Sequence, residues 1–560
     1  MGHEVNIESI RALEKRIEEG KGDIIEIKRT RNSLLNISTR IPPEILGYIF
    51  IWSVARERTY TLNSESPFDG LRKGSHNFLL VCHHWLEVAS RTPELWSFWG
   101  TTIWEWKKRY RHSRAAPLDL VLNGNANYLG ALEVPFQDVL RDRIMQDRIR
   151  QIHLKGYNPG LLASVISSLT PDGDDAREKC IESIVLHFAG NMTTIAGLSD
   201  FFARLRLPNL RYLDIRGTLQ ISSWDHLTSQ TTRLTALSLQ LSRPSFALTT
   251  STLISILASN PNLRELVLMY EALPGDADED TFPVPLRHLN TVYLSGACRR
   301  VFGLLHRLEL PAMLDSMSLV AHNSTVEDIS QTLGPYMRSH FRRDIRFQGR
   351  LGIVTSLSRD VIEISVSAAG DRLHQTFWLE RKPPRASFSM FLAGPPPQRV
   401  MKKLYLDLMA LTPREHVVYF ETTRHLKVPE ELFVAMPKIE TLRLYDVALS
   451  DGFLQPNPGG LHSNTKLFPS LRYLHLEYVG PNDADWNHLK VYLVHQTSGG
   501  QVISLRVSDG APNMRPEMEN EIKDLVEGFT YEPSCDCGCT SYEVGSNEDD
   551  EAGNGEADLD

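Results

Sequence analysis

The sequence is poor in cysteine and has no long apolar run. Six cysteines in 560 residues are too few for a disulfide framework, and three of them lie close together near the C-terminus. No stretch reaches the roughly 18 consecutive apolar residues that a membrane-spanning helix needs. The first residues also lack the hydrophobic segment of a secretory signal. We therefore expect a protein of the cytoplasm, the nucleus or both, with no membrane partner.

An excess of basic residues is also missing. The formal net charge is −9, and seven of these negative charges come from the tail 546–560, which contains no lysine or arginine. The rest of the chain is close to neutral, so it offers no large basic face for the phosphates of nucleic acid. We expect no nucleic-acid partner. The segment 531–560 is expected to be a cysteine-containing stretch followed by an acidic, disordered tail.

Common catalytic motifs are absent. The sequence contains no H-E-x-x-H, no G-x-x-x-x-G-K-[ST], no G-x-S-x-G and no dinucleotide-binding glycine pattern. We therefore predict no catalytic residues, no cofactor and no metal site. One alternative concerns Cys535, Cys537 and Cys539, whose thiolates suit Cu(I) or zinc and could also be oxidised. Their C-x-C spacing and the lack of any later histidine favour a plain flexible segment.

The region 41–110 is rich in aromatic residues and is predicted to form three helices, preceded by a helical arm over 1–40. Pro42-Pro43 starts the first helix, and Thr92-Pro93-Glu94 starts the third, which carries Trp96. In between, VCHHWLEVA combines a cysteine with two histidines. Adjacent histidines point about 100° apart on a helix, so they cannot converge on one ion with Cys82. Cys82 therefore acts as a small hydrophobic residue.

This region resembles the F-box family. The resemblance is carried by IPPEILGYIF (41–50), LLVCHHWLEVA (79–89) and ELWSFW (94–99), and it covers about 60 residues. It implies a small all-α domain of three helices that binds a Skp-type adaptor of a cullin ubiquitin ligase. The adaptor-binding residues that it implies are Pro43, Ile45, Leu46, Ile49, Phe50, Val81, Cys82 and Trp85. The alternative is a three-helix cap that only covers the next domain.

From 115 to 530 the sequence repeats a short apolar pattern. Four segments align without gaps: LPNLRYLDI (207–215), NPNLRELVL (260–268), MPKIETLRL (436–444) and FPSLRYLHL (468–476). Weaker copies start at Ile149, Ile181, Leu234, Leu289, Leu314, Met401 and Val502. Apolar residues two apart lie on the same face of a strand, so each copy predicts a strand with one apolar face. A strand with a short helix buries this face only when copies stack. The proline-rich stretch near 381–400 is expected to be a loop.

This region resembles an irregular leucine-rich-repeat array, of the kind often joined to F-boxes. The Asn or Cys that regular repeats carry three positions after the L-x-L is absent; Thr218, Glu271, Val447 and Val479 stand there. The resemblance implies an α/β solenoid whose polar strand positions face outward. Aromatic and arginine side chains commonly anchor protein interfaces. The target-binding candidates are Tyr212, Asp214, Arg216, Arg443, Tyr445, Tyr473, His475 and Glu477.

The resemblances imply a non-catalytic substrate receptor of a Skp–cullin–F-box ubiquitin ligase. In this reading the helices of 41–110 dock on the adaptor, and the repeats hold a target protein for ubiquitin-dependent degradation. One alternative is a protein-interaction scaffold with an F-box-like cap and no ligase role. Another is a ligase with its own catalytic cysteine among Cys535, Cys537 and Cys539.

Overall fold

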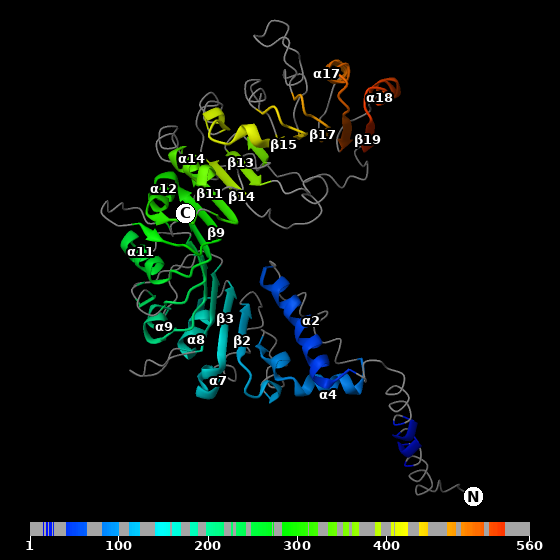
Figure 1. Cartoon of the computed structure of the whole chain (residues 1–560). Helices are drawn as coiled ribbons and strands as arrows, with labels where there is room; N and C mark the ends of the chain where they lie inside the picture. The colour runs from blue at the N-terminus through cyan, green and yellow to red at the C-terminus, as the bar shows by residue number, and fades with distance from the viewer. Residues whose placement is uncertain are drawn as a thin grey trace, which may run out of the picture. The chain divides into compact units, whose positions relative to one another are not determined.

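The computed structural model of the chain has two compact units, Met1–Leu263 and Arg264–Asp560, which we describe separately (Figure 1). The structure describes residues 15, 18–20, 22–24, 26, 41–63, 81–99, 111–123, 140–156, 159–169, 180–188, 198–217, 224, 226–227, 231–241, 248–270, 273, 283–311, 313–322, 334–343, 351–357, 361–368, 387–393, 405–407, 409–423, 436–445, 468–477, 483–508 and 515–532.

The first unit begins with two helices, α2 (Pro43–Asn63) and α4 (His83–Arg91), which pack against each other. A short 3₁₀ turn, η3 (Pro93–Trp96), follows α4. These elements share a small core made of Leu46, Phe50, Val88, Ala89, Leu95 and Trp96. The indole Nε1 of Trp96 donates a hydrogen bond to the carbonyl of Ala89 (2.7 Å), so this buried polar atom has a hydrogen-bond partner.

The expected fold class, an α/β solenoid preceded by an all-α domain of three helices, is wrong. The third helix is only the four-residue turn η3, and the chain then forms strand β1 (Phe98–Trp99). Strand β1 pairs with β2 (Leu118–Asn123), which joins this region to the sheet that follows. Among the described residues there is no separate three-helix domain. The protein is better described as α/β, with helices beside a large and mainly parallel sheet.

The sheet of the first unit is parallel and follows the chain order. After β1 and β2 come β3 (Ile149–Gly156), β4 (Ser183–Phe188), β5 (Tyr212–Gly217) and β6 (Ala236–Leu241). The register aligns apolar residues into two buried rows across β3 to β6. The rows are Ile152, Ile184, Leu213 and Leu237, and Leu154, Leu186, Ile215 and Leu239. This alignment explains why the apolar pairs of the repeated motif are two residues apart.

Helices α7 (Arg143–Arg148), α8 (Pro159–Leu169) and α9 (Leu198–Arg204) connect these strands, and α11 (Thr250–Ser259) follows β6. Figure 1 shows α8 and α9 on one side of the strands, and α8 contacts both β3 and α9. Asn260, which ends α11, is buried. Its side chain accepts a hydrogen bond from the Leu234 amide (2.9 Å) and donates one to the Ile256 carbonyl (2.8 Å). The asparagine of NPNLRELVL therefore links the end of α11 to the segment that leads into β6.

The sheet of the second unit contains one departure from chain order. Strands β7 (Glu265–Tyr270), β9 (Thr291–Ala297) and β11 (Ser316–His322) are parallel neighbours. Next to β11 lies β14 (Ser387–Ala393), then β13 (Val361–Ala368) and β12 (Leu351–Leu357), with β13 antiparallel to both neighbours. This inserted meander is incompatible with one uniform repeat.

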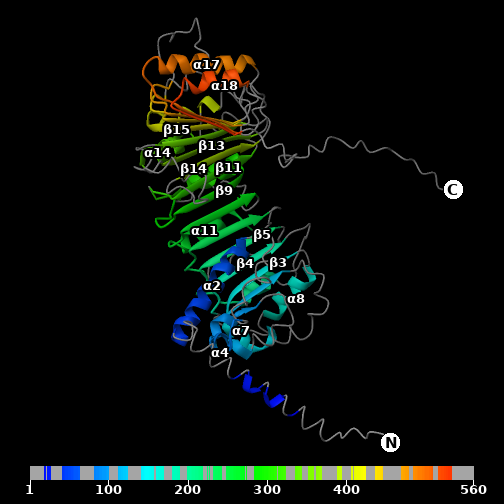
Figure 2. The same ribbon diagram turned by 90° about the vertical axis from the view of Figure 1, so that its right-hand side faces the viewer.

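Parallel pairing resumes after the meander. Strand β12 pairs with β15 (Val417–Thr423), and β16 (Thr441–Tyr445), β17 (Tyr473–Glu477), β18 (Ser504–Ser508) and β19 (Gly528–Glu532) follow in order. A separate two-stranded pair consists of β8 (Val284–Pro285) and β10 (Leu308–Glu309). The unit also contains η7 (Arg414–His416), α12 (Cys298–His306), α14 (Gly334–Arg343), α17 (Asp483–Thr497) and α18 (Pro516–Lys523). Figure 2 shows α17 and α18 side by side, in agreement with their contacts.

The structure places a strand at each of the four full copies of the motif, namely β5, β7, β16 and β17. Two other expectations are wrong. The loop expected near 381–400 contains β14, and the weak copy at Met401 is followed by a helical segment at 405–407 instead of a strand. Within 1–40, the described residues are helical, including Gly20 and Gly22. The cysteines at 535–539 and the acidic tail lie outside the described residues.

None of the described helices combines the length and the hydrophobicity that crossing a bilayer requires.

Candidate functional site

Helix α2 carries apolar residues on two faces, and only one of them is covered. The covered face presents Leu46 and Phe50 to the small core. The other face presents Ile45, Tyr48, Ile49 and Trp52, whose exposed fractions are 50%, 64%, 48% and 78%. These positions are spaced by three and four residues, so they form one stripe along the helix. We call these four residues the α2 stripe.

Burial of residues on the covered face of α2 changes part of the adaptor-binding set that the resemblance implies. Leu46 and Phe50 are buried, so we assign them to the core instead of to contacts with an adaptor. Trp85 is only partly buried, and its ring lies 5.1 Å from that of Phe50. Cys82 is half-buried, a free thiol that precedes α4. Pro43, Ile45, Ile49 and Val81 are exposed, as a contact surface requires.

The adaptor-binding set implied by the resemblance leaves out three exposed residues. Tyr48, Trp52 and Leu86 are exposed large apolar residues on α2 and α4. The spacing of Ile45, Tyr48, Ile49 and Trp52 was a usable signal, because it marks one helix face. Large apolar groups gathered on an exposed helix face indicate a surface that another molecule covers.

A polar cluster lies on the first unit's sheet, on the strand positions that alternate with the apolar rows. Asp214 of β5 accepts hydrogen bonds from Arg216 Nε (3.0 Å to Oδ1) and Nη2 (2.9 Å to Oδ2). The Nε2 atom of His187, on the adjacent strand β4, lies 3.0 Å from Asp214 Oδ2. Burial alone would raise the pKa of Asp214, but the hydrogen bonds from His187 and Arg216 outweigh it and lower the pKa from 3.8 to about 2.

This cluster changes the interpretation of two target-binding candidates. Asp214 is only 2% exposed, so it holds Arg216 and His187 in place and does not itself face solvent. Arg216 remains exposed and is the member of the cluster that a target can reach. Tyr212, on the same strand, is half-buried. His187 was not predicted, and only the strand register brings it beside Asp214.

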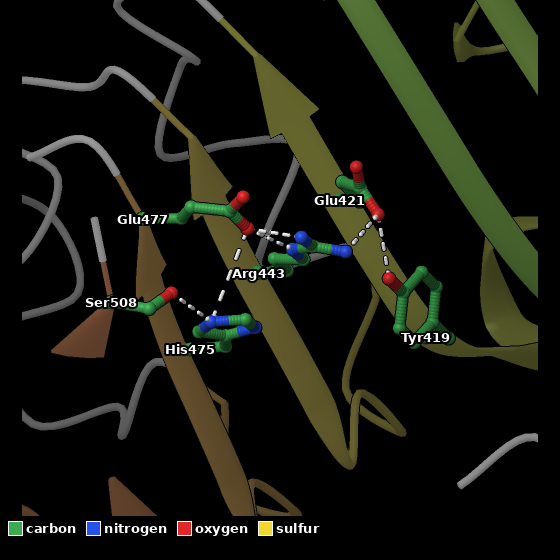
Figure 3. A network of polar contacts seen from close by, with 6 residues as sticks. All are labelled: Tyr419, Glu421, Arg443, His475, Glu477 and Ser508. Carbon is green, nitrogen blue, oxygen red and sulfur yellow. Dashed lines mark hydrogen bonds and ion pairs between the residues drawn. The ribbon is translucent and has the colours of Figure 1, made fainter. Parts of the chain in front are cut away.

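A second network spans four strands of the other unit (Figure 3). Arg443 of β16 lies between two glutamates: it donates to Glu477 of β17 through Nε (3.0 Å) and Nη2, and its Nη1 lies 3.8 Å from Glu421 of β15. The Tyr419 hydroxyl donates a hydrogen bond to Glu421 Oε2 (2.6 Å). His475 Nε2 lies 2.9 Å from Ser508 Oγ. The sequence pointed to Arg443, His475 and Glu477, and the structure brings them together.

In this network a single guanidinium is paired with two carboxylates. Burial would lower the pKa of Arg443, but the hydrogen bond to Glu477 and the charge of Glu421 raise it, so the guanidinium stays charged. Burial, together with Glu421, raises the pKa of Tyr419 well above its usual range. Arg443 is 12% exposed at its side chain. Removing one partner from such a partly buried network leaves another charge uncompensated, which is destabilising.

The geometry of His475 does not match a nucleophilic triad. In such a triad the base contacts the nucleophile through one ring nitrogen and the acid through the other. Here Ser508 Oγ and Glu477 Oε2 both lie nearest to Nε2, at 2.9 and 3.9 Å. Ser508 is also buried. We therefore assign His475 to the polar network.

The two remaining candidates lie on neighbouring strands. Tyr445 of β16 is half-buried, whereas Tyr473 at the start of β17 is exposed and lines a pocket. The described side chains include no group of three or more histidine, cysteine, aspartate or glutamate residues that could hold a metal ion. In comparisons with known proteins, no protein-family model matches the chain, and no curated protein matches it at a significant level.

Proposed function

We propose that the protein is a non-catalytic substrate receptor of a Skp–cullin–F-box ubiquitin ligase. The adaptor covers the α2 stripe, together with Val81 and Leu86, and the large parallel sheet holds the target protein. The observation that carries the proposal is the α2 stripe, a row of four large apolar side chains exposed on a helix whose opposite face is already packed. The sequence resemblance at 41–50 and 79–89 supplies the identity of the adaptor.

The energetics of the stripe support docking. Burying a fully exposed large apolar side chain contributes roughly 1.5–3 kcal/mol, so covering the exposed half or more of these four gives a favourable term that offsets part of the cost of association. Trp and Tyr are frequent anchors of protein interfaces. On the target side, Arg216 and Tyr473 are the exposed members of the predicted set. The receptor acts by holding the target near the ubiquitin-charged enzyme, which raises the effective concentration.

The test is the affinity of the full chain for a purified Skp-type adaptor, measured by isothermal titration calorimetry. We expect the double variant Ile45→Asp, Trp52→Asp to bind at least about 100-fold more weakly, because two apolar contacts are replaced by charges that must be desolvated. Both side chains are exposed, so the variant keeps its packed core. Val491→Asp, at an exposed position of α17, is the matched control and should bind normally.

Absence of binding by the intact chain, or equal affinity of the double variant, would contradict the proposal. In that case the alternative of an interaction scaffold without a ligase role would account better for the α2 stripe.

A further inference from the structure

A pocket of about 580 Å³ lies at the starts of β17, β18 and β19 in the second unit. Its lining includes Glu440, Arg472, Tyr473, Gln501, Val502 and Glu527. It is distinct from the Arg443 network, none of whose six members lines it. Among the target-binding candidates, Tyr473 is the one that lines this pocket.

The ladder of parallel strands fixes the backbone of this pocket. The amides of Arg472 and Tyr473 both donate to the carbonyl of Glu440 (2.8 and 3.0 Å). The amide of Glu527 donates to the carbonyl of Ile503 (3.0 Å). The side-chain amide of Gln501 donates to the carbonyls of Leu471 (2.6 Å) and Phe468 (3.2 Å), which holds the turn before β17 in place. The pocket is therefore preformed.

The charged groups of the pocket favour a cation. Two carboxylates, Glu440 and Glu527, accompany a single guanidinium, that of Arg472. The Arg472 amide donates to the Glu440 carbonyl, so these two oppositely charged residues are backbone neighbours just before β16 and β17. Within the described part of the chain, no side chain forms a hydrogen bond or ion pair with the Glu527 carboxylate. The pocket therefore carries a net charge of about −1.

Apolar surface lies beside these charges. Tyr473 is 40% exposed and Val502 is 54% exposed, although each has a large apolar group. A ligand that fits this pocket combines an apolar stem with a positively charged end. Lysine and arginine side chains have this composition, and a tyrosine ring also attracts a cation placed over its face.

We propose that this pocket binds a lysine or arginine side chain of the target protein. The stem lies against Tyr473 and Val502, and the cationic end pairs with Glu527. The inference deepens the proposed function, and rests on it in one respect: the second unit holds a protein target. It requires no contact with the adaptor.

The experiment is saturation-transfer NMR on the full chain with Nα-acetyl-lysine methylamide as the probe. The norleucine and glutamate analogues serve as comparison probes, because they remove or reverse the charge. We expect saturation at the side-chain methylenes of the lysine probe to exceed that of both analogues at least threefold. Glu527→Gln should reduce the lysine signal at least threefold, and 0.5 M NaCl should reduce it as well, because salt screens the ion pair.

Asp524→Asn is the matched control, since it removes a negative charge from an exposed position near Glu527 that does not line the pocket. This variant should keep the full lysine signal. Equal signals from the lysine and norleucine probes, a preference for glutamate, or an unchanged signal in Glu527→Gln would overturn the proposal. Adaptor affinity is measured separately, so failure of the proposed function and failure of the pocket are distinguishable.

Discussion

His153 of β3 interacts electrostatically with His187 and Asp214, and its Nε2 atom is buried with no hydrogen-bond partner among the described residues. Burial, with the positive charge of His187, lowers its pKa from 6.5 to about 4, and Asp214 opposes this shift only in part. The pKa of His153 is lower in the folded chain than in the unfolded chain, so this residue binds a proton more readily in the unfolded chain. The stabilisation by this group is complete above pH 6.5 and is lost as the pH falls toward 4.

This shift predicts a measurable pH dependence. Between pH 7 and pH 5, the free energy of unfolding of the first unit should fall by about 2 kcal/mol because of His153 alone. His153→Gln, which cannot titrate, should show a decrease smaller by this amount. The measurement is urea unfolding at both pH values. His83→Gln, on an exposed position of α4, is the control and should behave like the wild type. The same pH dependence in His153→Gln and in the wild type would show that His153 is readily protonated in the folded protein.

At the level of single residues, the sequence predicted on which face of the sheet a side chain lies. It was less successful in predicting how far that side chain is exposed. Asp214 and Arg216 alternate with buried Leu213 and Ile215, as the motif requires. The motif could not show that Asp214 is buried, because its partner His187 comes from another strand. Likewise, the Arg443 network depends on Glu421, which lies outside any L-x-x-L-x-L copy and is brought in only by the register of β15.

At the scale of elements, the end of β5 is constrained by Gly217. Its φ is +115°, and a Cβ atom built there would lie 2.1 Å from the carbonyl oxygen of Phe188 at the end of β4. Gly217→Ala should therefore destabilise the first unit by about 3 kcal/mol, because the residue must leave this conformation and separate two paired strands.

The matched control is Gly303→Ala within α12, where nothing lies within 4 Å of the added Cβ. Alanine is the better helix former, so this change should stabilise the second unit by up to about 1 kcal/mol. Thermal unfolding followed by circular dichroism measures both effects. A Gly217→Ala protein as stable as the wild type would show that β4 and β5 separate at this point without cost.

The elements that the sequence predicted well are those whose strands bury one apolar pair in register with neighbours. The elements that it missed have a different physical origin. Strands β12, β13 and β14 form an antiparallel meander, so their residues follow no repeat with the parallel strands. The apolar residues of the segment 94–99 have helical spacing. Its last two residues, Phe98 and Trp99, are nevertheless in an extended conformation because they pair with β2. Such long-range pairing overrides local preference.

For the whole molecule, the two proposed binding surfaces belong to different units and share no residue. The α2 stripe lies within Met1–Leu263, and the pocket at Glu527 lies within Arg264–Asp560. Substitutions at separate sites without shared partners usually have additive effects, within about 0.5 kcal/mol. The proposed receptor acts by positioning and needs no more than this, because the proposal does not require adaptor and target to affect each other's binding.

We therefore predict that Glu527→Gln leaves adaptor affinity unchanged within about twofold, and that Ile45→Asp, Trp52→Asp leaves the lysine signal unchanged. In the triple variant, adaptor affinity and the lysine signal should fall by the same factors as in the two separate variants. Calorimetry and saturation-transfer NMR on the same four proteins measure this directly. A change of more than about tenfold in adaptor affinity caused by Glu527→Gln corresponds to a coupling of about 1.4 kcal/mol. Coupling of that size would replace simple positioning with a mechanism in which target binding regulates assembly on the adaptor.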